Sequence, residues 1–99
     1  MGLYIVLIKI DDTFKSKEWY TERTDERYFS DFLTQEGVDA LIDKIKSDYP
    51  NSDIANDYQY GYRYHITYII LKADTLVNDR ENMWNLLHLA DCTDGRYDL

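Results

Sequence analysis

The chain has 99 residues, 44% of them hydrophobic, which suffices for one core but leaves no room for a cofactor domain beside a substrate domain. Its 19 acidic residues outnumber 11 basic ones, and the net charge of −8 argues against direct binding to nucleic acid or to an anionic membrane. The single cysteine, Cys92, excludes an internal disulfide and thiolate zinc motifs, and it favours a reducing, cytoplasmic compartment.

The first predicted element is a strand close to the N-terminus. Residues Leu3–Ile10 are almost continuously apolar and rich in β-branched side chains, a pattern typical of a central strand covered on both faces. Asp11 and Asp12 end it, and the run is far shorter than the ~20 residues of a membrane-spanning helix. In the residues that follow, Lys17–Thr24 alternates like an edge strand, whereas Asp25–Leu33 suits a loop or a short helical turn.

A helix is predicted after Thr34. Thr34 is a good N-cap, Glu36 suits the positive end of a helix, and Pro50 with Asn51 ends the pattern. Apolar residues at helical spacing define its buried side: Val38, Leu41, Ile42, Ile45 and Tyr49. We expect this side to pack on the first strand, against Ile5 and Leu7 or against their neighbours on the even-numbered face.

Residues 58–72 hold the densest group of tyrosines. A strand would place the even-numbered residues on one face, and these are Tyr58, Tyr60, Tyr62, Tyr64, Ile66, Tyr68, Ile70 and Lys72. Gly61 indicates either a bulge in one long strand or a bend between two shorter ones, and two strands are favoured. The tyrosines either pack under a helix as core or form a binding surface, because tyrosine buries a large area and keeps a polar tip.

A second helix is predicted over Asp79 to about Cys92, where Asn78 and Glu81 form a capping pair. Asp94 and Gly95 end it and leave a short tail. The element order is therefore β-(β)-α-β-β-α. This order predicts an α+β two-layer sandwich, a mainly antiparallel sheet of about four strands with two amphipathic helices, as a single domain over residues 1–99.

The sequence contains no motif that indicates a reaction, a metal or a cofactor. A metal-dependent hydrolase built on Asp11, Asp12 and His65 is one alternative, although these residues lack the short spacing of known metal motifs. Cys92 with His88 is the one nucleophile pair to consider, but neighbouring acids give the opposite of the electropositive setting that a reactive thiolate needs. We therefore expect a non-enzymatic protein with no metal and no cofactor.

The acidic surface is the main indication of function, although excess charge also serves solubility alone. In size and composition the chain is similar to phage-encoded inhibitors that mimic DNA and to immunity proteins that block nuclease toxins. The resemblance implies a basic protein partner, such as a restriction, CRISPR or toxin nuclease, whose surface the chain would block. The expected partner-binding residues are Glu36, Asp39, Asp43, Asp53, Asp57, Tyr58, Tyr60 and Tyr62. On a helix, Asp39 and Asp43 would stand ~6 Å apart, close to the spacing of neighbouring phosphates.

A small structural or regulatory homodimer is the alternative function. The apolar side of the second predicted helix covers about half of its circumference, which is more than one sheet face needs. Trp84 and Leu89 lie at opposite margins of that side. We expect one of them to stay accessible on the monomer and to join a symmetric contact.

Overall fold

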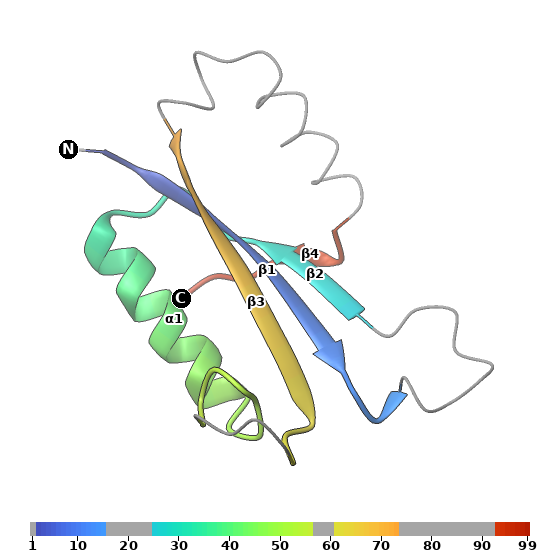
Figure 1. The fold of residues 1–99 in the computed structure, drawn as a ribbon. Helices are drawn as coiled ribbons and strands as arrows, with labels where there is room; N and C mark the ends of the chain where they lie inside the picture. The colour runs from blue at the N-terminus through green and yellow to red at the C-terminus, as the bar shows by residue number, and fades with distance from the viewer. Residues whose placement is uncertain (1, 16–24, 57–60, 74–92) are drawn as a thin grey trace.

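The computed structural model describes residues 2–15, 25–56, 61–73 and 93–99, which form a four-stranded sheet with one helix on one face (Figure 1). The elements are β1 (Tyr4–Asp12), β2 (Asp25–Phe29), α1 (Gln35–Asp48), β3 (Tyr64–Lys72) and β4 (Gly95–Arg96). The strands lie in the order β3-β1-β2-β4. The predicted α+β class with a sheet of about four strands is confirmed.

β1 is an inner strand of the sheet. It pairs antiparallel with β3 along its whole length, from Tyr4 opposite Lys72 to Asp12 opposite Tyr64. On its other side it pairs antiparallel with β2 from Leu7 to Asp11. The predicted central position is confirmed, because strands pair with β1 on both of its edges.

α1 begins and ends where the capping residues predict. The Thr34 side chain accepts a hydrogen bond from the Gly37 N–H at 3.2 Å, which satisfies one of the unpaired donors of the first turn. At the other end, the Tyr49 N–H still reaches the Ile45 carbonyl, and Pro50 follows outside the helix. The helix buries Val38, Leu41 and Ile45, as the spacing predicted.

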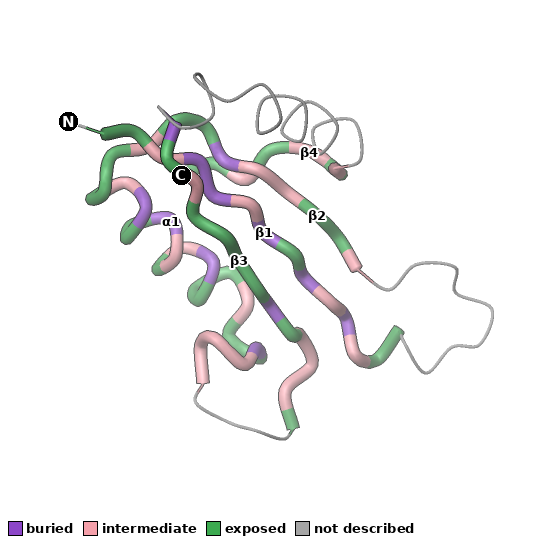
Figure 2. Tube along the Cα trace, turned by 45° about the horizontal axis from the view of Figure 1, so that its top comes forward, coloured by how far each residue is buried: buried purple, intermediate pink, exposed green. Residues whose placement is uncertain are grey.

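The core lies between α1 and the even-numbered face of β1. It consists of seven buried residues: Val6, Ile8, Ile10, Val38, Leu41, Ile45 and Ile66. Figure 2 shows these buried positions on β1 and the inner side of α1, whereas most of β3 is exposed. Of the two faces considered from the sequence, the even-numbered one therefore receives the helix.

The even-numbered face of β3 is core at one end and surface at the other. Tyr64 packs against the core and meets the Tyr49 ring edge-on at 5.0 Å, and Ile66 is buried. Further along the strand, Tyr68 and Ile70 are exposed. The core interpretation of the tyrosine-bearing face thus holds at the start of β3, whereas a binding surface at its exposed end stays a prediction.

Two strands differ from the sequence prediction. β2 occupies residues that the sequence assigned to a loop or a helical turn, because pairing with β1 overrides the weak strand preference of its charged residues. β4 replaces the predicted irregular tail after Asp94, and it pairs parallel with β2 through Tyr28 opposite Gly95 and Phe29 opposite Arg96. The sheet is therefore mixed, and the order of described elements is β-β-α-β-β.

Other predicted elements lie outside the described residues. These are the edge strand Lys17–Thr24, the tyrosines at 58 and 60, and the second helix from Asp79 to Cys92. Of the two strands predicted around Gly61, the one after it is β3, whereas the residues directly before Gly61 lie outside the described part of the chain. No helix in the described part of the chain is long and apolar enough to cross a membrane.

Candidate interaction surface

Three carboxylates form a stripe along the exposed side of α1. Glu36, Asp39 and Asp43 are all exposed, and they alternate with the buried Val38, Leu41 and Ile45. Residues three or four apart lie one above the other on a helix. Glu36, Asp39 and Asp43 therefore make one continuous line of negative charge, which we call the α1 stripe.

No cation in the described part of the chain forms an ion pair with the α1 stripe. Within residues 2–15, 25–56, 61–73 and 93–99, none of its three carboxylates is in an ion pair, and Asp39 accepts one hydrogen bond, from the Gln35 side-chain amide at 3.3 Å. On the same helix, Lys44 pairs instead with Asp48 at 3.4 Å and lies 4.5 Å from the centre of the Tyr97 ring. The charge of the stripe therefore faces solvent.

Most other described acids are paired within the chain. Asp25 pairs with Arg27 at 2.8 Å, and Arg96 joins Asp31 at 2.8 Å to Asp98 at 3.5 Å. Asp48 also accepts a hydrogen bond from the Tyr97 hydroxyl, which holds the pKa of its carboxyl below the usual value. The contacts of Arg96 and Tyr97 bind the C-terminal segment to the residues that follow β2 and to the end of α1.

The closest of these pairs to the core joins the end of β1 to the start of β3. Asp12 is buried, and its carboxylate accepts hydrogen bonds from Arg63 Nη2 at 3.0 Å and Nε at 3.3 Å. It also accepts the backbone N–H of Phe14 at 3.0 Å. The Arg63 hydrogen bond is the main cause that lowers the pKa of Asp12, and burial opposes it.

Asp53 is also engaged within the chain. Its Oδ1 accepts the Ile66 N–H at 2.9 Å, and its Oδ2 lies 2.5 Å from His65 Nδ1. The Tyr62 ring, half-buried, lies 6.3 Å from the His65 ring. His65 therefore lies near both Asp53 and Tyr62. The other predicted contacts of this region lie outside the described residues: Asp57, Tyr58 and Tyr60. The structure therefore gives Asp53 a role in holding the loop before β3 against that strand.

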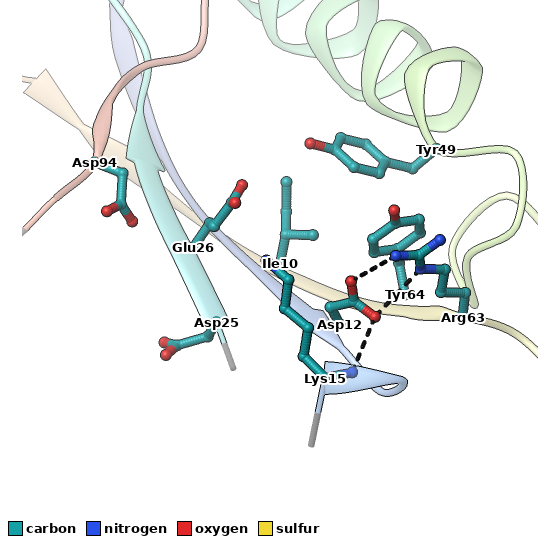
Figure 3. A pocket seen from close by; sticks show the side chains of 9 residues that line it. All are labelled: Ile10, Asp12, Lys15, Asp25, Glu26, Tyr49, Arg63, Tyr64 and Asp94. Atoms are coloured by element: carbon teal, nitrogen blue, oxygen red, sulfur yellow. Dashed lines mark hydrogen bonds and ion pairs between the residues drawn. The ribbon is translucent and has the colours of Figure 1, made fainter. Parts of the chain in front are cut away.

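A pocket of about 340 Å³ opens beside the Asp12–Arg63 pair (Figure 3). Its walls carry carboxylates on the β2 side and the Tyr49 and Tyr64 rings on the other. Arg63 lies 5.1 Å from the centre of the Tyr64 ring, where a cation from a ligand would otherwise bind. Arg63 therefore already occupies the cation-binding position of this pocket. For this reason the pocket is a weaker candidate than the α1 stripe for binding a basic side chain of a partner.

The residues considered for a metal site do not come together in the described part of the chain. Asp11 and His65 are cross-strand neighbours, but successive side chains of a strand alternate, so Asp12 points to the opposite face. No group of three metal-binding side chains is present among the described residues. Cys92, His88, Trp84 and Leu89 lie outside them.

Sequence reasoning missed the contacts that sort the acids into two groups. Asp12 and Arg63 are 51 residues apart, and Tyr97 and Asp48 are 49 residues apart. No local pattern connects residues at such separations. The helical spacing, in contrast, was enough to place the three acids of the α1 stripe together.

Comparison with known proteins adds no family. A scan against protein-family models and searches of curated proteins and of solved structures found no match. The functional proposals therefore rest on the residues that the structure describes.

Proposed function

We propose that the chain is a non-enzymatic interaction protein that binds a basic surface of a protein partner through the α1 stripe. The supporting observation is that Glu36, Asp39 and Asp43 share one exposed helix face and have no ion pair in the described part of the chain. Carboxylates without an internal cation keep their field in solution, where it attracts a surface of opposite charge.

The proposed partner is a protein that handles nucleic acid, such as a nuclease. Its basic surface binds phosphates, and a line of carboxylates on a rigid helix offers it negative charges at ~6 Å intervals. Occupying that surface would block access of the nucleic acid, so the chain acts as an inhibitor. Tyr62 stays a predicted anchoring contact, because a half-buried tyrosine ring can add contact area to a charged interface. Asp53 is engaged within the chain, and the contacts predicted at Asp57, Tyr58 and Tyr60 lie outside the described residues.

The test first identifies the partner and then measures its rate of binding. Tagged protein captures partners from a lysate of the source organism at low salt, and each candidate is then purified and assayed for nuclease activity and inhibition. Complementary charges steer the encounter, so the double variant Asp39→Lys/Asp43→Lys should slow association by roughly tenfold or more at low salt. The difference between wild type and variant should shrink as salt rises.

A matched control has the same change in net charge at another place. Asp31→Lys/Asp98→Lys reverses two exposed acids that pair with Arg96 rather than facing solvent alone. We expect this variant to associate much faster than the α1 double variant. If the two double variants are equally slow, net charge and not the α1 stripe governs binding. If the α1 variant associates as fast as wild type, the stripe is only a solvated face and the proposal fails.

A further inference from the structure

None of the described strands pairs with the outer edge of β3. β3 is the last strand on its side of the sheet, and β1 pairs with its inner edge (Figure 1). Odd-numbered residues bond inward, since Ala73 donates to Leu3 and Arg63 accepts from Thr13. In an antiparallel ladder the alternate residues point their N–H and C=O groups the other way. Tyr68, Ile70 and Lys72 therefore direct their backbone groups outward.

The start of this edge is already occupied. The loop at Asn51–Asp53 lies against it, where Asn51 accepts the Tyr64 N–H, and the Asp53 carboxylate accepts the Ile66 N–H. Beyond Ile66, no hydrogen bond reaches the outward groups of Tyr68, Ile70 and Lys72 in the described part of the chain. The open edge is thus a short segment with a defined beginning.

The open edge is apolar and carries no acid. Ile69 is 60% exposed, Ile70 42% and Tyr68 39%, and the residue that ends the strand is Lys72. Sheet proteins commonly protect such an edge with inward-pointing charges, a proline or a bulge. Residues 64–72 contain no acid and no proline, and their continuous pairing with β1 leaves no bulge, so the one protecting charge is Lys72 at the end of the strand.

We propose that this edge pairs with the same edge of a second copy of the chain, antiparallel about a two-fold axis at Ile70. In this register Ile70 faces Ile70 of the second copy, and Tyr68 faces its Lys72. The three residues with outward groups then bond to one another across the axis, and Ile69 meets Leu71 on the other face.

Charge and geometry favour a second copy as the occupant. No residue of β3 is acidic, so two chains of charge −8 can meet at this edge without opposing carboxylates, and Lys72 then lies opposite the Tyr68 ring of the second copy. An axis at Ile69 would instead require Ile66, whose N–H is taken by Asp53. The side chains of Tyr68, Ile69 and Ile70 are exposed, so this part of β3 is accessible to a second copy.

The test uses two opposite charges at the axis. Wild type should sediment as a dimer, at twice the 11.9 kDa mass of the chain, at high micromolar concentration. Ile70→Lys and Ile70→Glu should each weaken dimerisation by roughly tenfold or more, because like charges face each other directly. An equal mixture of the two variants should restore the dimer. The control Phe32→Lys replaces an exposed apolar residue outside the strands and should leave the dimer intact, and circular dichroism verifies that each variant is folded.

Hydrogen exchange then locates the contact. The amides of Tyr68, Ile70 and Lys72 should exchange more slowly as concentration rises, whereas they should stay fast in either charged variant. A wild-type monomer at high micromolar concentration overturns the proposal, as does a dimer indifferent to both charged variants, which would lie elsewhere. Protection of the three amides only on adding a different protein would assign the edge to that partner and equally overturn self-pairing.

Discussion

The two acidic regions of the molecule differ in what faces their carboxylates. At the junction of β1 and β3, Asp12 bonds to Arg63 and Asp53 to His65, so the acids hold chain segments together. Along α1, the stripe residues Glu36, Asp39 and Asp43 face solvent. The net charge of the chain does not distinguish the two regions. The position of the basic residues in the fold does.

This difference indicates which acids a partner can reach without a cost to the fold. Changing Asp12, whose carboxylate is buried, removes hydrogen bonds that join two chain segments, and this destabilises the folded state. Substitution of an exposed carboxylate that has no partner changes the stability of the protein little. Three measurements of stability can break or sharpen the comparison between the two regions.

The largest expected effect comes from the core that carries both regions. Leu41 of α1 is fully buried in the core between this helix and β1. Leu41→Ala should therefore lower the free energy of unfolding by ~2–5 kcal/mol. Urea denaturation followed by circular dichroism measures the change. A loss below ~0.5 kcal/mol would mean that α1 is not docked on the sheet and that the stripe has no rigid support.

The second expected effect separates the two regions directly. Asp12→Asn removes the charge that Arg63 faces and should lower the free energy of unfolding by ~1.5–3 kcal/mol, the range for hydrogen bonds to charged groups. Asp39→Asn is the same change on the α1 stripe and should stay within ~0.5 kcal/mol of wild type. Equal losses for the two variants, measured under identical conditions, would remove the distinction between paired and solvent-facing acids.

The smallest expected effect is the pH dependence that Asp12 contributes. Its pKa in the folded protein is lowered from 3.8, mainly by the Arg63 hydrogen bond. Its stabilising contribution is therefore fully present well above pH 3.8 and is lost as the pH falls below 3.8 through the lower folded-state pKa. The difference in unfolding free energy between wild type and Asp12→Asn should be constant near neutral pH and shrink in acid. A difference that grows on acidification would contradict this assignment.

The sequence by itself determined the elements whose signals are local. Thr34 and Pro50 mark the limits of α1, and helical spacing separates its buried residues from the acids of the stripe. The apolar run of β1 predicted an inner strand. These properties follow from backbone geometry and burial within one segment, so neighbouring residues carry enough information to predict them.

Only the tertiary structure decided the pairings between distant segments. β2 and β4 have weak strand signals, and they exist as strands because β1 and then β2 supply the backbone partners. The division of the acids into paired and solvent-facing groups has the same origin. Asp12 meets Arg63 because β1 and β3 pair in one register. Within the described residues, no basic side chain forms an ion pair with the α1 stripe. Strand register brings together residues that the chain separates, and no periodicity within a single segment encodes that contact.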